Sequence, residues 1–340
     1  MSKTLSSSSK IGIVGAAYLA FAIYLYQPYL ANSDKWQYLL IINPCLAAMG
    51  CFVLSRRWVG TIAGSFFAGA VYGFGPFMLG FARFHPTAGI LAALIPWLFC
   101  PAAFFAKENR LASAALAVLP FLAILLFFEV SAHFRLFVMP RQARLHLSDL
   151  PGFLAPLVSA KRGMSLIGFY HIPIAALIMG ISMMAAARRW GIIVIITLGT
   201  ALAFCWPIPG LDVSPISWFA IPSVCCAVLV GAGMQGLISS GFADRKWVLA
   251  ITIVMGALAI ATLLLATKYF QTFLFLGTGY ARLLVETGKL YVMGAVVVGT
   301  IFFMARAKLR VWWLRWVIFC LAMGVDIFLG ARFIVDRILF

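Results

Sequence analysis

Acidic residues are scarce in this chain. Its 340 residues include nine Asp and Glu against 26 Lys and Arg, and charged residues make up only 10% of it. Globular domains are about 25% charged, so the composition excludes a sizeable water-soluble domain. A net charge of +17 suggests nucleic acid in a soluble protein, but without a soluble basic domain we expect no nucleic-acid partner. The excess cations suit the orientation of membrane helices and contact with membrane lipid.

Several motifs that carry chemistry are also missing. The sequence has no C-x-x-C, H-E-x-x-H, P-loop or G-x-S-x-G. Its four histidines show no i,i+3 or i,i+4 spacing, so no metal motif is predicted, although a divalent metal held by residues that converge in space stays open. The letters G-x-G-x-x-G at Gly231, Gly233 and Gly236 lie in an apolar run and indicate helix packing. The seven cysteines are odd in number and lie in or beside apolar runs, which indicates small buried side chains.

Long apolar runs dominate the chain, which is 64% hydrophobic. Runs near 20 residues are typical of transmembrane helices, so the sequence predicts an all-α polytopic transmembrane bundle forming a single integral membrane domain over residues 1–340. Two further segments, 131–163 and 268–289, mix aromatic and aliphatic residues with cations and are expected to lie in the membrane interface. The expected spans number about eleven: 11–28, 36–54, 59–82, 87–106, 111–130, 165–187, 191–206, 216–239, 247–267, 289–305 and 312–331.

Basic residues collect in the short turns between spans. The positive-inside rule places these turns and the N-terminus in the cytoplasm, with the C-terminus outside. We therefore expect an integral protein of the bacterial cytoplasmic (inner) membrane with its active face extracytoplasmic. All four histidines and seven of the nine acids fall on the outer side or in the outer leaflet. These acids are Asp34, Glu129, Asp149, Asp212, Glu286, Asp326 and Asp336.

One glycine-rich apolar stretch, from Gly60 to Pro86, ends at the outer face. Its pairs Gly60/Gly64 and Gly69/Gly73 are small-xxx-small motifs, which let membrane helices approach closely. Gly75-Pro76 is expected to kink its last turns. The stretch is interpreted mainly as a packing helix that delivers Arg83 and His85 to the outer side.

Other polar residues lie in or at the ends of spans. Asp326 lies in the last span, about 16 Å from Arg315 on the same helix at 1.5 Å per residue, so it must pair with another helix or with water. It is interpreted as a structural acid near the outer interface. His171 is interpreted as a hydrogen-bonded packing residue. Glu129, His133 and Arg135 lie at the outer end of the fifth span, and a local ion pair is the simplest interpretation.

Part of the chain resembles a known family. Three stretches between Leu46 and Arg110 carry the resemblance: LAAMGCFVLSRRWVG, AGAVYGFGPFMLGFARFHP and LIPWLFCPAAFFAKENR. They resemble the N-terminal part of the GT-C superfamily of polytopic bacterial glycosyltransferases. The resemblance implies an extracytoplasmic site that takes a sugar from a polyprenyl-phosphate donor. Asp34, the one acid of the first outer loop, would act as catalytic base, with His85 as the other catalytic candidate. Candidates for binding the substrate are Arg83, Glu129, His133, Arg135, Arg141, Arg144, His171 and Asp326. The chain departs from the family in the shortness of this loop, which lacks a paired acid.

Three functions therefore stay open. The first is a transferase acting on a lipid-linked sugar or a related lipid. The second is a non-catalytic subunit or assembly factor that contacts a protein partner through its glycine-rich helices. The third is a transporter, a class with broken helices and polar groups near the membrane midplane. Gly75-Pro76 is one candidate break, but the polar residues are expected nearer the outer face.

Overall fold

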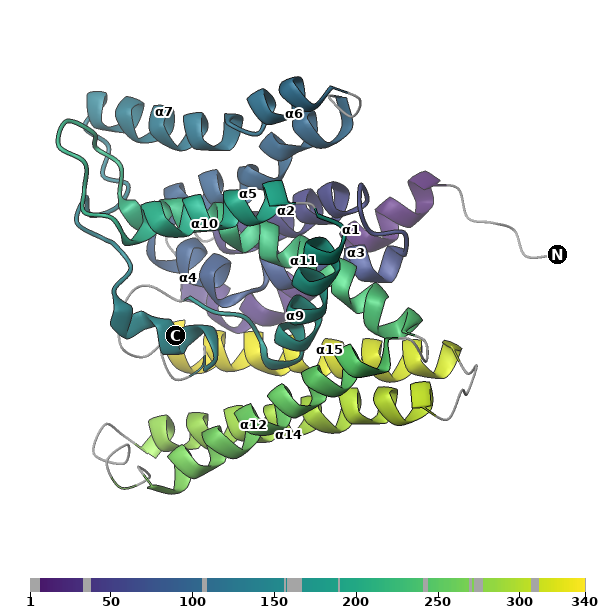
Figure 1. Ribbon diagram of the computed structural model, residues 1–340. Helices are drawn as coiled ribbons and strands as arrows, with labels where there is room; N and C mark the ends of the chain where they lie inside the picture. The colour runs from purple at the N-terminus through teal and green to yellow at the C-terminus, as the bar shows by residue number, and fades with distance from the viewer. Residues whose placement is uncertain are drawn as a thin grey trace.

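The protein is a bundle of α-helices. The computed structural model describes residues 7–32, 38–105, 109–155, 157, 167–188, 190–240, 244–268, 271, 278–306 and 312–339. Within these residues it contains helices and no strand (Figure 1). The α-helices are α1 Ser7–Tyr26, α2 Tyr38–Ser55, α3 Ile62–Gly73, α4 Pro76–Phe84, α5 Pro86–Cys100, α6 Arg110–Leu116, α7 Leu119–His133, α9 His171–Ala186, α10 Trp190–Phe204, α11 Ala220–Ser239, α12 Arg245–Lys268, α14 Thr278–Arg306 and α15 Trp312–Ile334.

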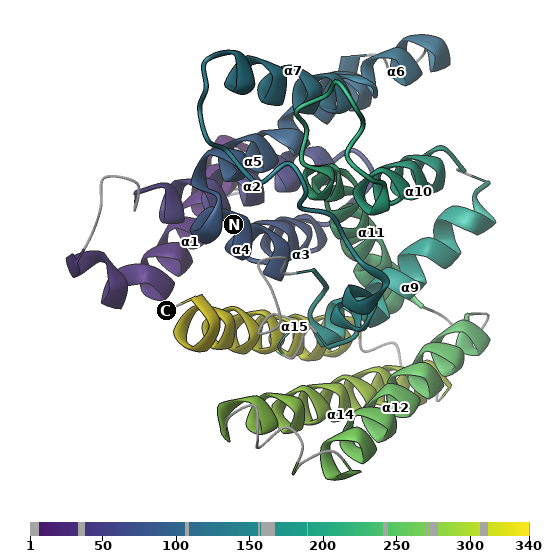
Figure 2. The ribbon, with the colours of Figure 1, turned by 90° about the vertical axis from the view of Figure 1, so that its left-hand side faces the viewer.

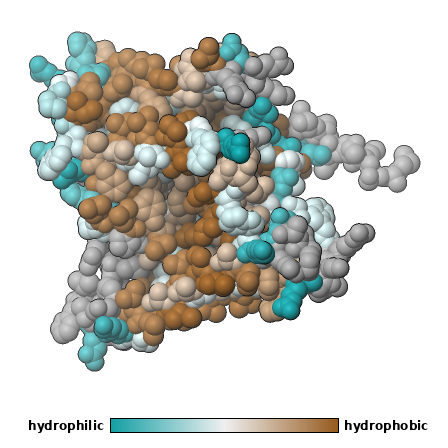
Figure 3. All heavy atoms as spheres, viewed as in Figure 1, coloured by the Kyte–Doolittle hydropathy of each residue, from teal (hydrophilic) through white to brown (hydrophobic). Residues whose placement is uncertain are grey.

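The helices match the expected membrane spans. In the described part of the chain, eight are long and apolar enough to cross a membrane, and the α3–α4 pair, bent by 41°, makes a ninth. The two remaining spans correspond to the shorter apolar helices α9 and α10. Figure 3 shows the matching surface, a broad apolar band with hydrophilic residues gathered toward its two ends. The predicted all-α polytopic bundle is therefore confirmed.

The two segments expected at the interface differ from one another. After α7 the chain runs without regular helix to the short 3₁₀ helix η3, Leu147–Phe153, while most of the predicted helix toward Gly163 lies outside the described residues. For the second segment, 268–289, the expected boundary with the next span is wrong. Residues 278–289 are not separate from that span but form the first turns of α14. Glu286 and Lys289 pair across one turn at 2.9 Å, which lets the helix continue through these charges.

Helix α11 is the centre of the bundle. It packs between α3 and α9 and is buried along almost its whole length. Gly231 faces the backbone of Gly64 on α3, and Gly233 faces the backbone of Ala176 on α9. A side chain at either position would collide with a neighbouring helix, so these glycines serve close helix packing, as predicted.

The glycine-rich stretch packs on the N-terminal helices. A side chain at Gly69 would meet the hydroxyl of Tyr18, and one at Gly73 would meet the backbone of Pro44. These glycines therefore contact helices of their own chain, while the predicted protein partner stays a prediction. On the far side, α12 and α14 form a long antiparallel pair next to α9 and α15 (Figures 1 and 2).

Candidate functional site

Helix α9 begins inside the bundle. Residues 167–170 approach it as extended chain and are buried, and the first helical residue, His171, has no exposed surface. Non-helical backbone at membrane depth is tolerated where protein surrounds it. The N-cap residue, Tyr170, makes no side-chain capping bond, so the free amide groups of the first turn need an acceptor from elsewhere.

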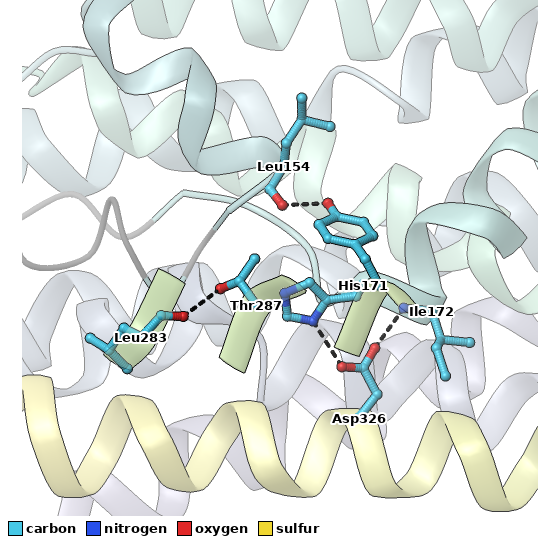
Figure 4. A network of polar contacts seen from close by, with 7 residues as sticks. Leu154, His171, Ile172, Leu283, Thr287 and Asp326 are labelled. Atoms are coloured by element: carbon cyan, nitrogen blue, oxygen red, sulfur yellow. Dashed lines mark hydrogen bonds and ion pairs between the residues drawn. The ribbon is translucent and has the colours of Figure 1, made fainter. Parts of the chain in front are cut away.

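Asp326 of α15 supplies this acceptor. Its Oδ2 accepts a hydrogen bond of 2.6 Å from the backbone N–H of Ile172, and its Oδ1 lies 3.0 Å from Nδ1 of His171 (Figure 4). Both side chains of the pair are completely buried. A carboxylate is favoured at the positive end of a helix dipole, which offsets part of the cost of burying its charge. The prediction that Asp326 pairs with another helix is confirmed.

The second ring nitrogen of His171 is open. With Asp326 as a carboxylate, which only accepts hydrogen bonds, Nδ1 is the donor of this contact, and Nε2 of the neutral ring is then an acceptor. Nε2 is buried and has no hydrogen-bond partner among the described residues. In Figure 4 it lies on the side of the ring turned toward Thr287 of α14. A proton added there would convert the pair into a neutral ion pair.

Two tyrosines flank the pair. The ring of Tyr291 on α14 meets the His171 ring edge to face at 4.8 Å between centroids, and its hydroxyl donates to the carbonyl of Leu154. Tyr170 and Tyr291 are both close enough to interact electrostatically with Asp326. Helices α9, α14 and α15 thus each contribute a polar side chain to one buried cluster.

The cluster lies near the middle of α14 and α15 and at the first turn of α9. Asp326 is about 21 Å along α15 from Trp312, and Tyr291 is about 20 Å along α14 from Thr278, at 1.5 Å per residue. Asp326 therefore holds the first turn of α9 as a structural acid, and its expected place near the outer interface stays a prediction.

The break in the α3–α4 span adjoins the cluster. Span α3–α4 breaks at Phe74–Gly75, with Pro76 as the first residue of α4. The Tyr170 hydroxyl donates a hydrogen bond of 2.5 Å to the carbonyl oxygen of Phe74. The predicted kink at Gly75-Pro76 is confirmed, and it lies against the start of α9, which the apolar pattern did not mark.

Arg83 and His85 diverge at the end of α4. Arg83 is exposed, and its Nε donates to the carbonyl of Leu339 at 3.4 Å. His85 is buried beside the ring of Phe81 and hydrogen-bonds to the backbone of Val138. Burial lowers the pKa of His85, and this hydrogen bond offsets part of the effect. The structure therefore does not join the two side chains in one polar group.

A separate polar cluster links α7 to the 205–214 loop. Arg141 forms an ion pair of 3.0 Å with Asp212, whose backbone N–H donates to Glu129 at 3.0 Å. Glu129 thus bonds to the distant 205–214 loop, and this contact replaces the expected local ion pair. The guanidinium carbon of Arg144 lies 3.3 Å from the ring centre of Trp206.

The remaining candidates stand apart from both clusters. His133 and Arg135 are exposed at the end of α7, where Arg135 adopts a left-handed conformation with φ 53°. The predicted base Asp34 lies outside the described residues. Among the residues that are described, no group of three or more His, Cys, Asp and Glu side chains is placed to hold a metal ion.

Sequence reasoning found His171 and Asp326 separately but did not pair them. Both were noted as polar residues in apolar spans, and nothing in the spacing of residues 171 and 326 indicates contact. Tyr170 and Tyr291 were missed as members of the cluster because aromatic residues are common throughout the chain. A polar-aromatic step such as Tyr170-His171-Ile172-Pro173 at the expected start of a span is the signal that could have marked the helix start.

Comparison with known proteins adds no further constraint on this cluster. No protein-family model, no curated protein and no solved structure matches the chain. The chemistry of the His171–Asp326 cluster must therefore be judged from its own geometry.

Proposed function

We propose that this protein is a proton-coupled transporter of the bacterial cytoplasmic membrane, in which the His171–Asp326 pair binds the coupling proton. The observation that carries the proposal is the fully buried 3.0 Å contact between the two side chains, with Nε2 of His171 left as an unpaired acceptor. Ionisable residues inside membrane spans are expensive to bury and mark ion pathways and proton relays.

The α3–α4 break and the buried start of α9 support the same function. Transporters often place their sites where discontinuous helices end near the midplane, because free backbone groups and helix dipoles are available there. Here the α3–α4 break and the start of α9 meet through Tyr170 and Phe74. Protonation of His171 would remove the excess negative charge at the α9 N-terminus and so change the contact between α9 and α15.

Proteoliposomes offer a direct test. Purified protein is reconstituted with a pH-sensitive dye inside the vesicles, an acid exterior is imposed, and neutral sugars, sugar phosphates, amino acids and glycerol phosphates are added in turn. We expect one class to speed the internal acidification severalfold. His171→Gln and Asp326→Asn should abolish this increase, whereas His146→Gln, at an exposed outer histidine, should keep it. The proposal would be overturned if none of these compounds increased the acidification. It would also be overturned if the increase persisted in both His171→Gln and Asp326→Asn.

A transferase on the outer face is the second candidate. The observation that favours it is the polar cluster of Arg141, Asp212 and Glu129, which brings a cation that suits phosphate beside two carboxylates. The resemblance of residues 46–110 supports a polyprenyl-phosphate sugar as donor and Asp34 as base. Membranes containing the protein would be given a radiolabelled polyprenyl-phosphate sugar, and transfer of label that Asp34→Asn and Arg141→Gln abolish would favour this candidate over transport.

A further inference from the structure

An apolar cavity opens among helices remote from the His171–Asp326 cluster. It has a volume of about 590 Å³ and lies between α6, α10 and α11, with the ends of α2 and α5 as further walls. The volume is within the range of small-molecule sites, roughly 300–1,000 Å³. Small side chains form much of the lining, including Ala103, Ala117 and Gly191. Its one hydroxyl, on Ser113, donates to the carbonyl of Ala102, so the cavity offers a ligand hydrocarbon contacts.

The cavity lies at the basic end of the bundle. Its walls come from the last turns of α2, α5 and α9 and the first turns of α6 and α10, which adjoin the basic turns at Arg56–Arg57 and Arg188. Helix α6 lies toward the end of the bundle at which α1 begins (Figure 1). Trp58 lines the cavity and is partly exposed, as tryptophans are at membrane interfaces. A ligand would therefore enter from the inner leaflet.

One arginine bonds to the cavity wall, and a second precedes a wall residue in the chain. Arg57 is half-buried, and its Nε donates a hydrogen bond of 3.0 Å to the carbonyl of Ala103 in the cavity wall. This bond fixes the guanidinium beside the opening, and no acid among the described residues forms an ion pair with it. Arg188 is exposed in the turn between α9 and α10, shortly before Gly191 of the cavity wall. An apolar cavity with a cationic rim matches a molecule that has a hydrocarbon chain and an anionic head.

We propose that the cavity binds one anionic phospholipid of the inner leaflet, with an acyl chain among α6, α10 and α11 and its phosphate at Arg57 and Arg188. Basic pockets between membrane helices on the cytoplasmic side are suited to anionic headgroups, and arginine matches phosphate oxygens in a bidentate fork. A zwitterionic lipid fits the cavity equally well but carries no net charge for the rim. This site is independent of the proton chemistry proposed for His171 and Asp326.

The test compares two lipids that differ only in their headgroups. Purified full-length protein in a non-ionic detergent is titrated with phosphatidylglycerol or with phosphatidylcholine of the same acyl chains, and bound lipid is counted by native mass spectrometry. We expect one phosphatidylglycerol to be retained at concentrations at least fivefold below those needed for phosphatidylcholine. Thermal unfolding provides a second measurement, because a ligand that binds only the folded state raises its midpoint.

Matched variants separate this site from general lipid binding. Arg57→Gln should remove most of the preference for phosphatidylglycerol, and Ala117→Trp should remove retention of both lipids by filling the cavity. Arg306→Gln removes an exposed cation from the end of α14, on the opposite side of the bundle from α6 in both ribbon views (Figures 1 and 2), and should change neither. The proposal would be overturned if the wild type retained the two lipids equally. It would also be overturned if Arg57→Gln and Arg306→Gln lost the same share of the preference for phosphatidylglycerol, and both outcomes can be read even if Ala117→Trp fails to fold.

Discussion

The hydroxyl of Tyr170 lies 2.5 Å from the carbonyl oxygen of Phe74, although 96 residues separate them in the chain. Phe74 ends α3 at the break of one membrane span, and Tyr170 caps the start of another, α9. Backbone groups freed at such breaks need partners within the protein. This hydrogen bond joins the break in α3–α4 to the start of α9, directly before His171.

Tyr170→Phe tests this bond directly. The change removes the hydroxyl and keeps the ring, so the Phe74 carbonyl loses a buried donor. Hydrogen bonds between membrane helices average about 0.6 kcal/mol and reach about 1.7, and we expect a loss near the upper value because the site is fully buried. Thermal unfolding in detergent measures it. Tyr29→Phe is the control, since its bond to Asp336 lies at the exposed outer end; an equal loss there would contradict the special role of Tyr170.

Gly330 of α15 makes room for the Tyr170 ring. A methyl group at Gly330 would collide with that ring, whereas one at Gly324 on the same helix would meet nothing within 4 Å. We expect Gly330→Ala to cost about 1–3 kcal/mol through overpacking. Gly324→Ala should instead stabilise the helix by up to about 1 kcal/mol, because alanine is the better helix former. Unfolding midpoints that shift in the same direction for the two variants would contradict the packing described for Tyr170.

The helical spans were predictable because each buries an apolar run of the length that a bilayer requires. The bend at Gly75-Pro76 was predictable for the same kind of local reason, since proline cannot continue the α3 ladder. The start of α9 was not, because residues 167–170 are as apolar as a helix and only contacts with Asp326 and Phe74 fix where the helix begins. Local pattern also misplaced the start of α14, which begins at Thr278 although Arg282, Glu286 and Lys289 interrupt the apolar run.

The candidate site was harder to predict than the spans. Asp326 was recognised as needing a partner, but the partner is a histidine on α9, 155 residues earlier in the chain. Arg83 and His85 are two residues apart in sequence, yet Arg83 is exposed and His85 is buried. The turn between α4 and α5 separates their side chains.

Asp326 combines a structural role with a proposed functional one, and two substitutions separate them. Asp326→Asn keeps an oxygen that can accept from the Ile172 N–H, so we expect a loss of only about 1 kcal/mol. Asp326→Leu leaves this N–H and the His171 Nδ1–H without acceptors, and each buried unsatisfied group costs about 1–3 kcal/mol. Denaturation in detergent should rank the proteins wild type, Asn, Leu in falling stability.

The same carboxylate should fix the tautomer of His171. Nitrogen-15 NMR of labelled histidine in the wild type at high pH should show the Nδ1–H form, because Asp326 accepts that proton. In Asp326→Asn the amide can present its oxygen or its nitrogen, so a mixture of tautomers is expected. A wild-type spectrum in the Nε2–H form would contradict the 3.0 Å contact as a hydrogen bond to a carboxylate.

His85 should make stability depend on pH. Burial lowers the pKa of His85 from its ordinary value of 6.5, so between these two pKa values the unfolded chain binds a proton that the folded protein does not. Stability then rises with pH in this window: it is highest above pH 6.5, falls as the pH drops through 6.5, and levels off below the lowered pKa. His85→Gln should flatten this part of the curve of unfolding midpoint against pH between 8 and 5. His146→Gln, at an exposed outer histidine, should keep the wild-type slope, and a slope that persists in His85→Gln would show that another group is responsible.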